Sequence, residues 1–444
     1  MSYLIHTKQR LIASFNKLIK HSVMPLALAG LMATATSPTL ATDIQISQEP
    51  VAPRGDYNIL LFENLRMDLT GKVGVLYDDN VDNAEDDEES GTAVIPRLSL
   101  GIDWPITPHV RLGTGLDIGY RAYVSGEGED NFILSESGGG ISTSLNADVF
   151  IGNGVLRLSE SFRRDADTLD VLRSDSTDDY ARNRNTLKAR YTVPVSEYIT
   201  LIAEAERRDT WVSPDQYEYQ DNNRNILFLN ALYQMNPKLQ VGPYARWEKI
   251  DYDDTDQTTP LPVGPFLVSV SREKADRTTP EVGMSFLYQR EAGFTVEGSA
   301  GYEFMDVDPT NPFITDEEDG FTGDISCIFS TSRKTQHSLR VSHDRKQALT
   351  SLFANYSEET SYSYAVSSNI MPDVTVSGDL TYLDIRESDR GENADIYRVG
   401  VGTGYQFTRK LNGRIRYEYV KKNSDRSGSD YDRNQVRLTL SYDF

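Results

Sequence analysis

The chain has 444 residues, of which 67 are acidic and 45 are basic, and its formal net charge is −22. This excess of negative charge argues against nucleic-acid binding, which requires a basic surface. Beyond residue 41 no stretch approaches 18 consecutive apolar residues, which excludes a helical membrane protein.

The N-terminal segment has the three parts of a secretory signal peptide. Basic residues come first, an apolar run follows at 23–33, and the small-residue end Thr39-Leu40-Ala41 comes last. The apolar run is too short for a membrane-spanning anchor. We therefore predict a signal peptide at 1–41, a short periplasmic lead at 42–67 and a single barrel domain at 68–444.

From residue 68 onward one unit recurs, consisting of a strand, a tight turn, a second strand and a long polar loop. Residue types that reverse a chain within a few positions mark eight tight turns, near 105–108, 152–154, 194–197, 236–238, 290–293, 332–335, 371–373 and 408–410. With an opening strand at 69–77 and a closing strand at 435–444, the eight hairpins give about 18 strands. The alternative count is 16, because the strands around 131–150 and 321–330 are the least clear.

The last nine residues alternate strictly between apolar and polar side chains. Apolar residues occupy the even positions from Val436 to Phe444, and polar residues such as Arg437 occupy the odd positions. A one-residue slip would move Arg437 into lipid, at a cost of about 2–4 kcal/mol near the midplane. Short turns at one rim, long loops at the other and a terminal aromatic residue are typical of bacterial outer-membrane barrels.

These patterns predict an all-β fold, a transmembrane antiparallel up-and-down β-barrel in the bacterial cell outer membrane, with short periplasmic turns and long extracellular loops. Tyr442 and Phe444 are its expected C-terminal assembly signal. A β-propeller also repeats about every 40–45 residues, but its blades consist of four short strands with comparable loops. The hairpins of this chain favour the barrel.

A barrel of 16–18 strands leaves an aqueous lumen. Strand parity directs ten arginines inward as expected pore-lining residues: Arg111, Arg121, Arg157, Arg190, Arg246, Arg340, Arg398, Arg414, Arg416 and Arg437. One interpretation is an arginine-rich wall that attracts anionic or hydroxyl-rich solutes. The other is self-pairing with carboxylates across the wall, which stiffens the barrel whatever it transports.

The loop 249–278 is the longest, and its segment 260–268 is too apolar for a freely solvated loop. Either it folds into the lumen as a constriction, through Pro262, Phe266 and Leu267, or it packs on other loops outside. The sequence leaves both open.

Catalysis finds little support. Ser342 and His343 are the one Ser/His neighbourhood of interest, but strand parity places them on opposite faces. No metal-ligand spacing or phosphate-binding loop stands out, so we expect no enzyme activity, no cofactor and no metal.

Two short motifs carry a family resemblance: Tyr77-Asp78-Asp79-Asn80-Val81, and Ser429-Asp430-Tyr431-Asp432-Arg433-Asn434, which feeds the strand ending at Phe444. They resemble the outer-membrane beta-barrel porin type 2 family, over roughly 69–444. Members are often associated with exopolysaccharide production in Gram-negative bacteria, so the resemblance implies a conduit for exopolysaccharide export. It supplies no established catalytic or ligand residue.

We therefore expect a porin-like conduit for exopolysaccharide or another hydrophilic solute. The alternatives are a general diffusion porin for small solutes and a non-conducting structural or adhesive surface barrel. The expected partners are outer-membrane lipid and lipopolysaccharide, the outer-membrane barrel assembly machinery, and periplasmic and inner-membrane components of polysaccharide export, but no nucleic acid.

Overall fold

The computed structural model describes residues 59–61, 65–81, 83–86, 88–126, 131–133, 141–165, 181–213, 215–253, 258–263, 266–271, 275–290, 293–308, 319–347, 356–388 and 391–444. The signal peptide predicted at 1–41 lies outside the described residues, and so does most of the lead predicted at 42–67. Both remain predictions.

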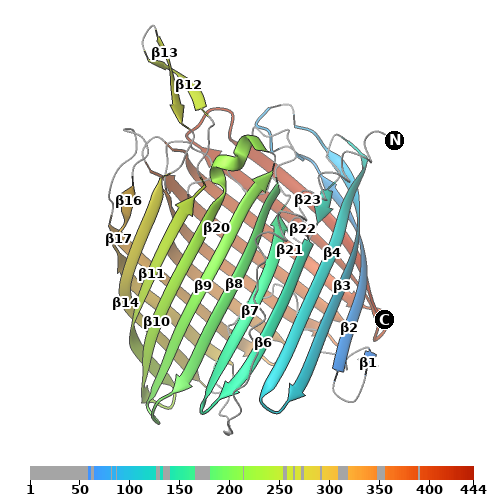
Figure 1. Cartoon of the computed structure of the whole chain (residues 1–444). Helices are drawn as coiled ribbons and strands as arrows, with labels where there is room; N and C mark the ends of the chain where they lie inside the picture. Colours follow the sequence, from blue (N-terminus) through green and yellow to red (C-terminus); the bar gives the residue numbers. More distant parts are fainter. Residues whose placement is uncertain are drawn as a thin grey trace. The chain divides into compact units, whose positions relative to one another are not determined.

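Within the described part of the chain, 18 long strands form one closed antiparallel barrel, which confirms the predicted fold and decides against 16 strands (Figure 1). Each strand pairs with the next, and β2 pairs with both β3 and β23, which closes the ring. The strands are β2 (Leu65–Asp78), β3 (Gly91–Thr107), β4 (Val110–Ser125), β6 (Ile141–Ile151), β7 (Gly154–Asp165), β8 (Ala181–Pro194), β9 (Ile199–Ser213), β10 (Asn222–Asn236), β11 (Leu239–Tyr252), β14 (Asp276–Arg290), β15 (Phe294–Glu303), β17 (Gly320–Ser332), β18 (Thr335–Gln347), β19 (Tyr356–Met371), β20 (Val374–Glu387), β21 (Asn393–Gln406), β22 (Leu411–Ser424) and β23 (Tyr431–Asp443).

Shorter elements extend this ring. The strands β1 (Ile59–Leu61), β5 (Asn131–Ile133) and β16 (Asp306–Asp308) pair with β2, β4 and β14, respectively. The hairpin of β12 (Thr258–Val263) and β13 (Phe266–Ser271) forms a two-stranded sheet of its own. The 3-10 helix η1 (Asp215–Gln220) follows β9, and no helix in the described ranges is long and apolar enough to cross a membrane.

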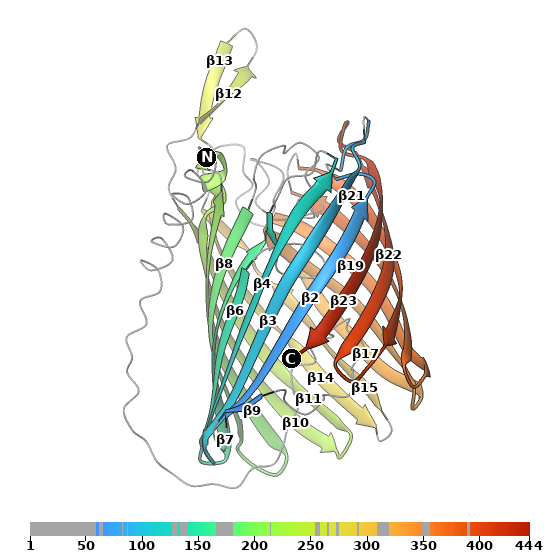
Figure 2. The ribbon, with the colours of Figure 1, turned by 90° about the vertical axis from the view of Figure 1, so that its right-hand side faces the viewer.

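Eight connections of two to four residues join strands at one rim, which we call the short-turn rim. They match the eight predicted tight turns, but the first lies further along the chain than predicted. Pro105 lies inside β3, and the chain reverses at 108–109. A register irregularity between Pro105 and Thr107 accommodates proline, which has no N–H to donate. Strand β23 ends at this rim (Figure 2), which faces the periplasm in barrels of this kind.

The alternation predicted for the closing strand is present. Leu438, Leu440 and Tyr442 are exposed on the outer face, whereas Arg433 and Gln435 are buried on the inner face. The apolar outer face can contact lipid in the bilayer, and the polar residues between the apolar ones face the lumen.

Candidate functional site

A cavity of about 900 Å³ lies inside the barrel. Its lining comes from β8, β9, β10, β11, β14 and β15 and, beyond β17 in the ring, from β18, β19 and β20. The cavity therefore borders nine of the 18 strands of the ring.

The charge of this lining is opposite to that of the chain. Eight basic and five acidic residues line the cavity: Arg182, Arg184, Lys188, Arg190, Arg208, Arg224, Arg246 and Lys346, with Glu204, Glu206, Glu281, Asp344 and Glu359. Basic residues thus outnumber acidic residues in the cavity lining, whereas acidic residues predominate in the whole chain.

Strand periodicity places these side chains. On β8 the even positions, including Lys188 and Arg190, line the cavity, and the odd residue Leu187 is exposed outside. On β9 the consecutive residues Arg207 and Arg208 divide in the same way, since only Arg208 lines the cavity.

Cross-strand register gathers three arginines into one row, which we call the arginine row. Arg208 on β9 lies opposite Arg224 on β10, and Ile250 on β11 lies between Arg224 and Arg277 of β14. The next row toward the short-turn rim contains Glu206 and Glu248. Like charges directly opposite each other are unfavourable on a sheet, so this arrangement needs the neighbouring carboxylates.

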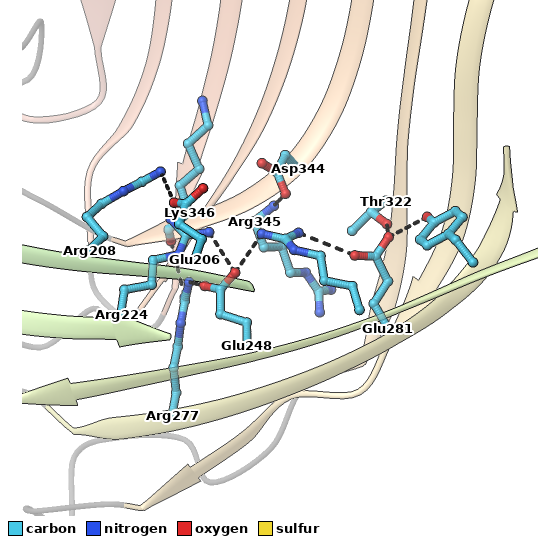
Figure 3. Close-up of polar contacts among 12 residues, drawn as sticks. Glu206, Arg208, Arg224, Glu248, Arg277, Glu281, Thr322, Asp344, Arg345 and Lys346 are labelled. Atoms are coloured by element: carbon cyan, nitrogen blue, oxygen red, sulfur yellow. Dashed lines mark hydrogen bonds and ion pairs between the residues drawn. The ribbon is translucent and has the colours of Figure 1, made fainter. Parts of the chain in front are cut away.

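Glu248 supplies most of that compensation (Figure 3). One carboxylate oxygen lies 2.6 Å from a guanidinium nitrogen of both Arg224 and Arg246, and the other lies 3.4 Å from Arg277. Arg208 lies 2.7 Å from Glu206. Three guanidinium groups thus contact one buried carboxylate, and one of them, Arg246, has a second carboxylate partner.

Glu281 anchors the adjacent part of the wall (Figure 3). Its carboxylate accepts hydrogen bonds from the Tyr244 hydroxyl at 2.5 Å, the Thr322 hydroxyl at 2.7 Å and Arg246 at 3.3 Å. Arg246 therefore bridges Glu248 and Glu281. These bonds hold the guanidinium groups in fixed positions rather than leaving them to move in solvent.

At least seven of the ten arginines predicted to line the pore contact carboxylates. The closest contacts are Arg111–Asp103 (2.6 Å), Arg157–Asp148 (2.7 Å), Arg190–Glu204 (3.9 Å), Arg246–Glu248 (2.6 Å), Arg340–Asp324 (2.9 Å), Arg398–Glu418 (3.7 Å) and Arg416–Asp379 (2.8 Å). Of the remaining three, Arg121 is buried, Arg414 lies opposite Thr439, and Arg437 lies opposite Arg416.

The structure gathers only Arg190 and Arg246 of the ten into the large cavity. The alternation of inward and outward positions, considered one strand at a time, did not identify the arginine row. Arg208 could have been found from the alternation in β9, but its neighbour Arg207 makes the inner face ambiguous. A conducting role for the ten arginines stays a prediction.

The predicted constriction residues belong to the separate hairpin. Pro262 pairs with Leu267, and Val263 pairs with Phe266. The lining of the large cavity, as far as described residues form it, includes none of them. Their role as a constriction stays a prediction.

The predicted assembly-signal residues lie together on the outer face. The rings of Tyr442 and Phe444 meet edge to face at 5.2 Å between centroids, and both are exposed. Recognition of these residues by assembly machinery stays a prediction.

Ser342 and His343 are consecutive in β18. Ser342 lies between Asp324 and Ser361, whereas the Nδ1 atom of His343 lies 2.9 Å from the Thr360 hydroxyl. No group of three or more His, Cys, Asp or Glu residues in the described ranges could hold a metal ion.

Residues 268–444 match the model of a family described as Putative beta-barrel porin 2. This confirms the resemblance over the C-terminal part of the barrel. The chain forms a porin-like β-barrel of the bacterial outer membrane. No curated protein matches the chain.

Several solved structures are similar to it. Pseudomonas aeruginosa OpdK with vanillate has 13% identity and a TM-score of 0.48, over 86% of this chain and 99% of OpdK. A BenF-like porin from Pseudomonas fluorescens Pf-5 has 13% identity and a TM-score of 0.46, over 86% and 99% of the two chains. The outer-membrane protein OprD from Pseudomonas aeruginosa has 11% identity and a TM-score of 0.44, over 86% and 93%.

Proposed function

We propose that the barrel is a channel for hydrophilic solutes and that it favours anions. The observation that carries this proposal is the basic excess of the cavity lining, eight residues against five, in a chain of net charge −22. Charge that lines a narrow bore with low-dielectric walls raises the local concentration of the opposite ion.

The contacts of the arginine row support a channel for anions rather than a wall neutralised by self-pairing. Glu248 has two oxygens, which three guanidinium groups share. Each guanidinium group has five N–H donors in a rigid fork, so Arg224 and Arg246, which line the cavity, keep donors for a passing carboxylate or another anion. Self-pairing and solute attraction therefore operate together in this wall.

The size of the solute is a separate part of the proposal. We favour a small hydrophilic anion. Exopolysaccharide export is the alternative that the family resemblance implies, and an acidic polysaccharide would carry the charge that this lining favours. Lipopolysaccharide around the barrel, the outer-membrane assembly machinery, and periplasmic and inner-membrane export components remain proposed partners.

Planar-bilayer recordings of the purified barrel in a potassium chloride gradient test the proposal. We expect a reversal potential of the sign set by chloride. A cation-selective channel would refute the anion preference, and a barrel without conductance would favour a structural or adhesive role. Swelling of proteoliposomes in small anionic solutes, compared with acidic oligosaccharides of increasing length, separates the small-solute channel from polysaccharide export.

A further inference from the structure

The two short motifs that carry the family resemblance meet in the structure. The first motif, 77–81, covers the last two residues of β2 and the three residues after it. The second motif, 429–434, covers the two residues before β23 and the first four residues of β23. These strands close the ring, with Asp78 opposite Gln435 as the last pair of their ladder. No hairpin joins these two strands, so the ring closes only when residues more than 350 positions apart in the sequence pair with each other.

A buried charged pair lies at this point. The Nε atom of Arg433 lies 3.0 Å from each carboxylate oxygen of Asp78, and a second guanidinium nitrogen also contacts this carboxylate. The third nitrogen donates to the side-chain oxygen of Asn83 at 3.1 Å, and the Gln435 amide donates to Asp78 at 2.7 Å. The side chains of Asp78 and Arg433 are only 0% and 1% exposed.

A second set of contacts extends the pairing beyond the ladder. The backbone and side-chain amides of Asn434 donate to the two carboxylate oxygens of Asp79, at 2.6 and 2.7 Å. The backbone amide of Asp79 donates back to the Asn434 carbonyl at 3.2 Å. The Asn80 side-chain amide donates to the Asp432 carbonyl at 3.0 Å. Three consecutive residues of the first motif, 78–80, therefore contact three consecutive residues of the second, 432–434.

A buried ion pair contributes little net stability, but the loss of one partner leaves an uncompensated buried charge and is strongly destabilising. A shift of β23 along β2 would separate Arg433 from Asp78 and leave both charges buried and unpaired. A two-residue shift would keep every apolar side chain of β23 on the outer face, so alternation alone does not exclude it. The buried pair of Asp78 and Arg433 excludes such a shift, because its two charges would be separated.

We propose that Asp78, Asn83, Arg433 and Gln435, with Asp79 and Asn434, form a closing clasp that selects the register in which the last strand joins the first. The clasp acts on ring closure and is independent of the solute that the channel conducts.

Thiol cross-linking tests the clasp, in the complete chain with Cys327→Ser as the background. Val75 lies opposite Leu438, so Val75→Cys with Leu438→Cys reports the native register. Val75→Cys with Leu440→Cys, or with Val436→Cys, reports a shift of two residues. All four positions are exposed on the outer face, which keeps the cysteines out of the clasp.

With Asp78→Asn, the yield of the native cross-link should fall about tenfold or more, because Arg433 is left without its counter-charge. Glu248→Gln is the matched control: it removes a buried carboxylate from Arg224 and Arg246 on β10 and β11, away from β2 and β23, and the native cross-link of the folded barrels should be unaffected. An equal loss in the control would overturn the proposal, since the effect would then be general instability.

The double variant Asp78→Leu with Arg433→Met separates register from stability, because replacing a buried ion pair by apolar residues of similar volume is often neutral for stability. We expect this variant to form barrels that resist unfolding in SDS without heating, but to give the native and the shifted cross-links together. A double variant that gives only the native cross-link would refute the clasp, because the register would then be set without it.

Discussion

The aromatic ring of Phe444 lies on Gly71 across the seam between β23 and β2. A Cβ atom at Gly71 would lie 3.1 Å from the ring, closer than the ring could accept without moving. The backbone amide of Phe444 also donates to the Leu69 carbonyl at 3.0 Å. The seam is therefore held at the short-turn rim by an aromatic ring on a glycine and at the opposite rim by the clasp.

Gly71→Val should displace the Phe444 ring and destabilise the seam by about 1–3 kcal/mol, the usual cost of overpacking. The measurement is the urea midpoint of the folded band in SDS gels. Gly404→Ala is the control, because its added Cβ would meet no atom closer than 3.9 Å. Equal midpoints for Gly71→Val and the unaltered protein would show that the ring does not need the glycine.

Lys346→Gln should weaken the anion preference, because it removes one of the eight positive charges that line the cavity. Lys421→Gln is a matched control: both lysines are about half exposed and contact a carboxylate, but Lys421 does not line the cavity. The reversal potential in a salt gradient is the readout. The same shift in both variants would mean that the cavity does not set the selectivity.

Glu248→Gln should act in the opposite direction, because Arg224, Arg246 and Arg277 lose the carboxylate they share. Anion preference should rise, and the barrel should lose about 3–5 kcal/mol of stability as buried charges become unpaired. Bilayer recordings of the folded fraction and unfolding in urea measure the two effects. A lower anion preference would contradict the role assigned to the arginine row.

The anion preference should also depend on salt. The Debye length falls from about 10 Å at 0.1 M to about 3 Å at 1 M, so the field of the lining is screened at high ionic strength. At a fixed gradient, the ratio of anion to cation permeability should fall as the mean salt concentration rises. It should approach the mobility ratio of the same ions in free solution. A ratio that does not change with salt would point to selection by size.

Deletion of 256–272 tests the predicted constriction. If Pro262, Phe266 and Leu267 narrow the lumen, single-channel conductance should rise. Because β12 and β13 pair only with each other among the described strands, the ring should still close. An unchanged conductance would show that the hairpin does not obstruct the pore.

The barrel could be predicted from sequence because its signals are local. Alternation from Val436 to Phe444 and turn residues such as Gly152, which has a positive φ of 59°, depend on a few neighbouring positions. The predicted turn began too early, at Pro105, because proline usually ends a strand. In the structure β3 continues past Pro105, since an irregularity in the pairing with β4 accommodates the proline.

The arginine row and the clasp could not be predicted in the same way. Arg208 and Arg224 become neighbours only once the register of β9 on β10 is known, and Arg277 joins them from a strand further around the ring. Asp78 and Arg433 lie in motifs that the sequence marked as similar to a family, but their contact depends on which strands close the ring.

The meeting of β2 and β23 has a use in protein engineering. Since the first strand begins and the last strand ends at the same rim, a short linker could join Phe444 to Leu65 while new chain ends are opened in a loop elsewhere. In such a circular permutant, Asp78 and Arg433 would belong to one continuous hairpin. The order of synthesis of the strands could then be varied while every side-chain contact in the wall stayed the same.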